Sequence, residues 1–148
     1  MIVSGSLAHI TDLVDLFDQY RLFYKRTSDR SAAAHFLTQR IQNKESVIFL
    51  YYVANVAVGF TQLYPKYSSA NMVQNWILND LFVTEEHRKT GVGRQLINAA
   101  VAFAQDQGST FILLETQQDN TAAQSLYRNM GFVQQVPDEE FLPFKKNI

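Results

Sequence analysis

Two amphipathic helices are predicted near the start of the chain. Along residues 10–24, apolar side chains recur at steps of three and four positions, with aspartates between them. Ser28 and Asp29 can cap a second helix, which runs to about Asn43. Residues 1–3 precede both helices as a candidate strand, so the chain is expected to begin with one strand and two helices.

The middle of the chain has the residue pattern of strands. Residues 46–54 are rich in β-branched and aromatic side chains, a turn is expected at 55–56, and 57–64 continues as a second strand. The small and polar residues 65–71 indicate a loop, and a third strand is expected at 75–83. This region therefore predicts an antiparallel hairpin followed by a further strand.

The second half of the chain alternates helices and strands. The expected elements are a helix from Gly91 to Gly108, a strand at 110–115, a helix capped by Asp119 and Asn120 that ends at Gly131, and two closing strands at 132–136 and 140–145. The strand–helix–strand unit within 75–115 implies parallel pairing there. The whole pattern predicts an α/β (α+β) fold, in which helices cover a mixed sheet.

Composition narrows the class of protein. With 148 residues and 47% hydrophobic content, the chain is expected to form one domain, 1–148. Its 13 Lys and Arg against 14 Asp and Glu argue against nucleic-acid or membrane partners recruited by bulk charge. The longest apolar run, Val47–Ala54, is far shorter than the roughly 20 residues of a membrane-spanning helix. We therefore expect a soluble, cytoplasmic protein, and the lack of cysteine excludes disulfides and a cysteine nucleophile.

The strongest chemical signal is a glycine-containing loop between an expected strand and an expected helix. It runs from Arg88 to Arg94 and reads Arg-Lys-Thr-Gly-Val-Gly-Arg. The first N–H groups of a helix lack partners within it, so such a loop suits a phosphate. The run lacks the Walker pattern, and the third glycine of a dinucleotide fingerprint would fall on Leu96. It matches Arg/Gln-x-x-Gly-x-Gly/Ala, although a turn that binds nothing remains an alternative.

A second motif lies one strand later and makes the pattern specific. It reads Asn120-Thr-Ala-Ala-Gln-Ser-Leu-Tyr-Arg-Asn-Met-Gly-Phe132. With the glycine loop and Asp80-Leu-Phe-Val83 before it, this motif resembles the GNAT superfamily of acetyl-CoA-dependent N-acetyltransferases, over residues 75–133. The resemblance implies the GNAT fold: a mixed, mostly antiparallel sheet of six to seven strands with about four helices. It also implies that the strands at 75–83 and 110–116 splay apart around the thioester.

The resemblance also implies a role for each matched residue. Backbone groups of Leu81, Phe82 and Val83 would pair with the pantetheine arm of acetyl-CoA, and the side chain of Asn120 would bond to the same arm. Tyr127 would protonate the departing CoA thiolate, a proton transfer that a phenol can perform. The loop that would hold the pyrophosphate consists of Arg88, Lys89, Thr90, Gly91, Val92, Gly93 and Arg94.

The general base and the acceptor site are less clearly marked. Asp80 is the expected base, and strand alternation is expected to place Asn79 on the opposite face from it. Polyamine acetyltransferases, which this segment resembles, carry an acid at the position of Asn79. Glu115 follows the next strand, and Tyr24 and Trp76 are candidates for an aromatic acceptor wall that suits a cation. Each of these side chains also has a purely structural explanation.

The sequence therefore predicts an enzyme that acetylates a primary amine by direct attack, with a small amine or polyamine favoured as acceptor. The run Tyr-Arg-Leu-Phe-Tyr at 20–24 resembles a subgroup that contains fungal histone and polyamine acetyltransferases. A protein lysine or N-terminal acetyltransferase and a non-catalytic acyl-CoA-binding module are the alternatives. No metal-ligand spacing is found, so no metal is expected, and family habit suggests a homodimer.

Overall fold

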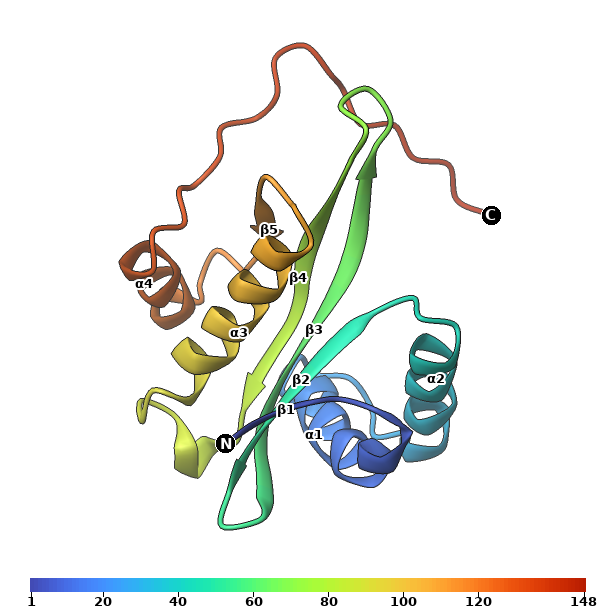
Figure 1. The fold of residues 1–148 in the computed structure, drawn as a ribbon, viewed down its shortest axis with the longest axis vertical. Coiled ribbons are helices and arrows are strands. Elements are labelled where there is room, and N and C mark those ends of the chain that lie inside the picture. Colours follow the sequence, from blue (N-terminus) through green and yellow to red (C-terminus); the bar gives the residue numbers. More distant parts are fainter. The chain divides into compact units, whose positions relative to one another are not determined.

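A five-stranded mixed sheet, in the order β1-β2-β3-β4-β5, organises the first part of the chain (Figure 1). The computed structural model describes residues 1–148, which divide into two compact units, 1–115 and 116–148. The second unit carries α4 (Thr121–Asn129). The elements of the first unit are β1 (Ile2–Ser4), the 3-10 turn η1 (Leu7–His9), α1 (Ile10–Phe23), α2 (Arg30–Gln42), β2 (Val47–Val53), β3 (Val56–Ser68), β4 (Val73–Val83), the 3-10 turn η2 (Glu85–His87), α3 (Val92–Asp106) and β5 (Ile112–Leu114).

The pairing of the strands leaves part of β4 with a neighbour on one side only. Strands β1 to β4 pair antiparallel, whereas β5 pairs parallel with β4. The parallel ladder joins only Trp76–Leu78 to Ile112–Leu114, while β3 follows β4 to Val83. No strand of the sheet therefore pairs with Asn79–Val83 on the β5 side, and this stretch of β4 offers a free backbone edge.

Helices cover both faces of the sheet. Helices α1 and α2 lie on one face and α3 lies on the other (Figure 1). The α1 side of the core contains Leu13, Leu16, Leu37, Leu50, Phe60 and Phe82, all nearly or fully buried. On the α3 side, Val92 and Leu96 pack against Val58. This arrangement hides the apolar stripe of each helix, which is the main source of its stability.

A β-bulge in β4 changes which side chains face α1. The register passes from Gln62 opposite Asp80 to Leu63 opposite Leu78, so Asn79 is an extra residue in β4. Before the bulge, Trp76 faces α3, where its ring packs against Phe103 at 5.0 Å between centroids. If the alternation of side chains continued unbroken through Asn79, Asp80 would point to the same face as Trp76. The bulge instead turns Asp80 toward the α1 side.

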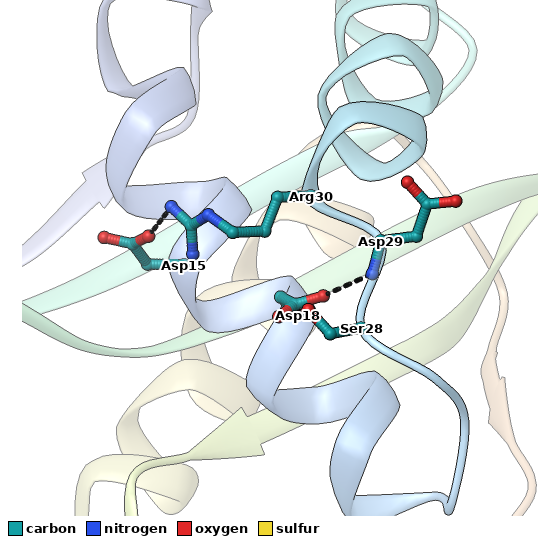
Figure 2. Close-up of polar contacts among 5 residues, drawn as sticks. All are labelled: Asp15, Asp18, Ser28, Asp29 and Arg30. Carbon is teal, nitrogen blue, oxygen red and sulfur yellow. Dashed lines mark hydrogen bonds and ion pairs between the residues drawn. The ribbon is translucent and has the colours of Figure 1, made fainter.

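The corner between α1 and α2 is fixed by carboxylates. Asp18, which is buried in α1, accepts hydrogen bonds from the Ser28 hydroxyl at 2.7 Å and the Asp29 N–H at 3.1 Å. The bond from Ser28 is the main cause of a lowered pKa at Asp18. Arg30 pairs with Asp15 (Figure 2). Asp29 caps α2 through the N–H of Ala32, as predicted. These bonds set the position of α1, whose C-terminal turn reaches the candidate site.

All four α-helices end in the same backbone motif. In each, the N–H of the residue two past the C-cap bonds back to the carbonyl five residues earlier, and the residue between has positive φ. Glycine supplies this conformation in α3 and α4, at Gly108 and Gly131, and lysine supplies it in α1 and α2, at Lys25 and Lys44. The two glycine stops agree with the sequence prediction, whereas nothing in the sequence pattern marked the two lysines.

Several predicted boundaries within the first unit are wrong: β4 begins at Val73 rather than at 75, and β5 covers only Ile112–Leu114 of the strand predicted at 110–115. The hairpin turn lies at Ala54 and Asn55, both with positive φ, one residue earlier than expected. Strand β3 also continues to Ser68, through the region predicted to be a loop. Pro65 is tolerated there because β2 accompanies β3 only as far as Leu63, so Pro65 lies where β3 has a neighbour on one side.

The two predicted closing strands do not form, and the sheet has five strands rather than six or seven. Within the region 140–145, Pro143 has no N–H to donate, and the N–H groups of Glu140 and Phe141 bond to the carboxylate of Asp138. Three of the six residues in this region, 140, 141 and 143, therefore have no free N–H to offer to a strand ladder. In the region 132–136, the helix stop uses the N–H of Phe132. A single domain spanning 1–148 stays a prediction.

Candidate active site

The free edge of β4 offers backbone groups next to the glycine loop. The N–H of Thr84 bonds to the carbonyl of Val58 at 2.9 Å, which makes these residues a hydrogen-bonded pair. Hydrogen-bonded and non-hydrogen-bonded pairs alternate along an antiparallel ladder, so Leu81 and Val83 belong to non-hydrogen-bonded pairs. Their N–H and C=O groups therefore point away from β3. These groups are available on the side where β5 does not pair with β4. The side chain of Phe82 is buried in the α1-side core.

The loop between β4 and α3 is held in a defined conformation by its own side chains. Thr84 and His87 join at 3.0 Å between Oγ1 and Nδ1, and the Thr90 hydroxyl donates to the carbonyl of His87 at 2.6 Å. Lys89 and Gly91 have φ values of 62° and 92°, which glycine adopts without strain and lysine does not. The loop thus turns sharply just before α3 begins.

The first turn of α3 presents unpaired backbone donors. The first helical hydrogen bond runs from the N–H of Gln95 to the carbonyl of Gly91, at 3.0 Å. The N–H groups of Val92, Gly93 and Arg94 therefore have no partner within the helix. Gly91 offers no capping side chain, and the cationic side chains of Lys89 and Arg94 are exposed beside this turn. Such a helix start favours a bound anion, and a pyrophosphate fits it.

Arg88 occupies a different environment from its neighbours in the loop. Its Nε donates to the carbonyl of Val83 at 3.0 Å, which ties the loop back to the end of β4. Its guanidinium carbon lies 5.2 Å from the ring centroid of Phe23 and 5.8 Å from that of Phe82. The guanidinium therefore contacts α1 as well as β4.

Asp80 is a buried carboxylate, with 4% of its surface exposed. Its Oδ2 accepts from Gln62 Nε2 at 2.7 Å, and its Oδ1 accepts from Asn79 Nδ2 at 3.0 Å. Burial raises the pKa of Asp80, and hydrogen bonds from Gln62, Tyr20 and Asn79 act in the opposite direction. Gln62 is itself fully buried, and its Oε1 accepts from the Ser46 hydroxyl at 2.8 Å.

Three tyrosines surround this carboxylate. Burial, and then the negative charge of Asp80, raise the pKa of Tyr20 and of Tyr24, and they raise that of Tyr64 to about 12. The rings of Tyr20 and Tyr24 meet edge to face at 4.9 Å between centroids. A buried carboxylate among neutral phenols forms a site of net negative charge with aromatic walls, which suits an ammonium group.

The structure brings together only some of the side chains predicted for the acceptor side. Tyr24 and Asn79 lie near Asp80, but the prediction that Asn79 and Asp80 occupy opposite faces is wrong, because the bulge lets their side chains bond to each other. Trp76 is buried against Phe103 on the other face, so it does not join this wall. Glu115 is exposed directly after β5.

The two predicted residues of the second unit lie on α4. The Oδ1 of Asn120 accepts from the N–H of Ala123 at 3.1 Å, which makes Asn120 the N-cap of this helix, as predicted. Tyr127 is partly buried, and its ring packs against Phe132 at 6.0 Å between centroids. Tyr127 and Phe132 occupy the two positions of the helix stop whose side chains normally touch. The stop at Gly131 thus helps to orient the predicted acid.

Sequence reasoning missed Gln62 and Ser46. The available signal was the alternation of Phe60, Gln62 and Tyr64, which places an amide on the apolar face of a strand. A polar side chain at such a position needs a buried partner. The identity of that partner depends on the register between β3 and β4, which the sequence pattern does not specify.

Comparisons with known proteins agree with this geometry. The model of the acetyltransferase (GNAT) family matches residues 11–132. The chain belongs to the GNAT acetyltransferase family. The uncharacterized N-acetyltransferase YhfO of Bacillus subtilis strain 168 is 40% identical over 136 residues, which cover 92% of this chain and 89% of YhfO. A probable acetyltransferase of Haemophilus influenzae is 31% identical over 125 residues, 84% of each chain.

Solved structures of GNAT proteins and their relatives share the fold. A crystal structure of a probable acetyltransferase superposes with a TM-score of 0.90 at 36% identity, covering 100% of this chain and 97% of that one. The aminoglycoside N-acetyltransferase AAC(6')-Iy in complex with CoA gives a TM-score of 0.83 at 20% identity, over 100% and 95% of the two chains. This second likeness concerns the fold alone.

The family identifies the chain as an acetyl-CoA-dependent N-acetyltransferase with an α+β GNAT-like fold of four helices and a five-stranded mixed sheet. The predicted enzyme class is confirmed, whereas the likeness to a fungal histone and polyamine subgroup is not supported. No helix has the length and apolar character needed to span a membrane.

Proposed function

We propose that this GNAT enzyme transfers the acetyl group of acetyl-CoA to a primary amine, a small amine or polyamine rather than a protein. The observation that carries the proposal is the buried carboxylate of Asp80 among Tyr20, Tyr24 and Tyr64, next to the free edge of β4. The negative charge and aromatic rings suit an alkylammonium. The burial of Asp80 favours a narrow acceptor, such as an amine at the end of an alkyl chain.

Backbone groups of the first unit would hold the donor. Leu81 and Val83 offer N–H and C=O groups to the pantetheine arm, and the N–H groups that begin α3 offer donors to the pyrophosphate. The exposed charges of Lys89 and Arg94 favour the same anion. When bound, acetyl-CoA supplies an activated thioester carbonyl that an amine can attack without a covalent enzyme intermediate.

Two side chains of this protein would then carry out the two proton transfers, from the ammonium and to the thiolate. An alkylammonium has a pKa near 10, so it must lose a proton before its nitrogen can attack. Asp80 accepts that proton through one bridging water, because so little of its surface is exposed. Its raised pKa makes Asp80 a stronger base than an exposed aspartate. Tyr127 donates a proton to the thiolate that departs, with Asn120 as a further contact to the donor.

The experiment that tests this function follows thiol release from acetyl-CoA with a panel of polyamines, monoamines, aminoglycosides and lysine peptides. The chain has no cysteine, so a thiol reagent reports only the CoA released. We expect turnover with unhindered primary amines and little with folded protein substrates. Turnover confined to lysine peptides or to protein N-termini would overturn the proposed acceptor class. Tight CoA binding without turnover of any amine would indicate a non-catalytic acyl-CoA-binding module.

The roles in the second unit have their own test. Tyr127→Phe keeps the ring that packs against Phe132 and removes the hydroxyl. We expect this change to lower kcat by about 100-fold, the lower end for loss of a general acid, while CoA affinity stays the same. An unchanged kcat would show that Tyr127 is not the general acid. The proposed homodimer is tested separately by light scattering at micromolar concentration, where a monomeric mass would exclude it.

A further inference from the structure

The guanidinium of Arg88 connects three parts of the first unit. Its Nε donates to the carbonyl of Val83, the last residue of β4, at 3.0 Å. Its central carbon lies over the ring of Phe82 in β4 at 5.8 Å and over the ring of Phe23, the last residue of α1, at 5.2 Å. A planar cation suits this position, because it can donate in its plane while its charge faces aromatic rings.

The other cations of the loop are not held in this way. All three cationic side chains are exposed, but Lys89 and Arg94, which lie beside the unpaired N–H groups of α3, make no side-chain hydrogen bond or ring contact. Arg88 directs its Nε to the strand, and its charge lies against two rings. The loop cations therefore differ in their contacts. Arg88 contacts other parts of the protein, whereas the side chains of Lys89 and Arg94 remain available to a ligand.

The contact between Arg88 and Phe23 leads on to the surroundings of Asp80. Phe23 meets Tyr24 edge to face at 5.2 Å between centroids, and Tyr24 meets Tyr20 at 4.9 Å. Tyr20 in turn packs against Phe82 at 6.4 Å and contributes a hydrogen bond to Asp80. The rings at the end of α1 therefore form a continuous chain from the glycine loop to the buried carboxylate.

We propose that Arg88 and Phe23 act as a positioning pair, which fixes the C-terminal turn of α1 against the loop between β4 and α3. The inference rests on the proposed function in one respect, because that function assigns the loop to the donor and the surroundings of Asp80 to the acceptor. The pair sets the spacing between the two substrates. Arg88 is thus a positioning residue and not a phosphate ligand, which differs from the role that the sequence resemblance implies.

The test compares two donors in four variants. Acetyl-CoA carries phosphates, whereas S-acetylpantetheine carries the same thioester and arm without them. Arg88→Lys keeps the charge but loses the planar donor, and Phe23→Leu keeps an apolar side chain but loses the ring. Phe23→Trp restores a ring, and the double variant Arg88→Lys with Phe23→Leu completes a double-mutant cycle. Thermal unfolding of each variant reports any loss of folded protein.

If Arg88 and Phe23 position the substrates, their variants should lose the same factor in kcat with acetyl-CoA and with S-acetylpantetheine, which lacks the phosphates. Arg88→Lys and Phe23→Leu should each lower kcat by about 3- to 10-fold with both donors, with a smaller change in KM for the donor. The double variant should lose little more than the worse single variant, and Phe23→Trp should keep the wild-type kcat. Phe36→Leu is the matched control, because Phe36 also lies under an arginine, Arg40 at 4.5 Å, and is also joined to Tyr20 through one ring, that of Phe17, but does not contact the loop between β4 and α3. Its kinetics should be those of the wild type.

Three results would overturn the proposal. A loss in Arg88→Lys with acetyl-CoA alone would make Arg88 a phosphate ligand, and additive effects in the double variant would show that the two side chains act separately. A wild-type kcat in Phe23→Leu would show that the ring of Phe23 has no positioning role. If the wild-type protein acetylates no amine, the proposed function fails on its own. The pair is then tested by calorimetric titration with CoA and pantetheine, in which Phe23→Leu and Arg88→Lys should change the affinity for both ligands by the same small factor; a loss confined to CoA would overturn the proposal.

Discussion

The loop between β4 and α3 and the surroundings of Asp80 form the two sides of the candidate site, and they are built in opposite ways. The loop is one contiguous stretch, residues 84–94, in which backbone N–H groups without a helical partner are proposed to bind the donor. The surroundings of Asp80 are buried and come from α1, β3, β4 and the residue before β2. Side chains that are far apart in sequence converge there.

This difference follows from the demands of the two substrates. A pyrophosphate is recognised by peptide N–H groups, which every residue has, so a short loop of the correct shape suffices. An amine must be oriented and deprotonated, and this requires a carboxylate whose pKa is adjusted by burial and by specific donors. The loop side should therefore be sensitive to backbone conformation, and the Asp80 side to the loss of single hydrogen bonds.

The largest expected effect is that of Asp80→Asn. This change keeps the shape of the side chain and removes the proposed base, so kcat should fall by about 100-fold or more. CoA affinity, measured by calorimetry, should remain within about twofold of the wild type, because the contacts proposed for the donor lie on the loop side. A kcat near the wild-type value would show that Asp80 is only structural and would end the comparison between the two sides.

The same variant has a predicted stability with a definite sign. Burial raises the pKa of Asp80 above its unfolded value. The stability contributed by such a group is complete below the unfolded pKa and is lost as the pH rises through the folded pKa. The unfolding temperature of Asp80→Asn should therefore rise relative to that of the wild type as the pH is raised from about 4 to about 8. The opposite trend would indicate that the hydrogen bonds outweigh burial.

The second effect concerns Gln62, which sharpens the comparison because it touches only the Asp80 side. Gln62→Leu removes the donor to Oδ2 of Asp80, so the pKa of that carboxyl should rise further. The acidic limb of the pH–rate profile should move up by about one to two pH units, the equivalent of a hydrogen bond to a charged group. Ser46→Ala, which acts only by orienting Gln62, should move it less. An unchanged pH–rate profile would show that Asp80 is not the group whose ionisation limits the rate at acidic pH.

The third effect compares two glycines at the two ends of α3. Gly91 and Gly108 have φ values of 92° and 76°, and a Cβ at either position would meet nothing within 4 Å. Alanine at each should therefore cost only conformational strain, about 1 kcal/mol of unfolding free energy. Gly91→Ala should also weaken CoA binding, measured by titration, whereas Gly108→Ala should not. Equal CoA affinities in the two variants would show that the turn at Gly91 has no part in binding.

The smallest effect is at the end of α2, at a residue that makes no contact with Asp80 or with the loop. Lys44 has a φ of 55°, which strains a residue with a side chain. Lys44→Gly should stabilise the protein by about 0.5 kcal/mol in urea unfolding, and the kinetics should not change. A destabilised Lys44→Gly would mean that contacts of the lysine side chain outweigh the strain.

The loop side was predictable from sequence because its structure is local. Arg88 to Gly93 matched a motif in which the glycine spacing and the adjacent helix start belong to one short stretch. The same holds for the caps at Asp29 and Asn120 and for the stops at Gly108 and Gly131. The loop predicted at 65–71 from its small and polar residues is wrong because residues 65–68 of β3 pair with β4.

The sequence by itself determined the family, the helices and the place of the loop that is proposed to bind the donor, because these depend on periodicity, capping and glycine at nearby positions. Only the tertiary structure decided what lies around Asp80. The bulge at Asn79 sets the face of the carboxylate, the strand register brings Gln62 to it, and the packing of α1 places Phe23 over Arg88. Each of these depends on which distant segments meet, and that is determined by the burial of apolar surface across the whole sheet.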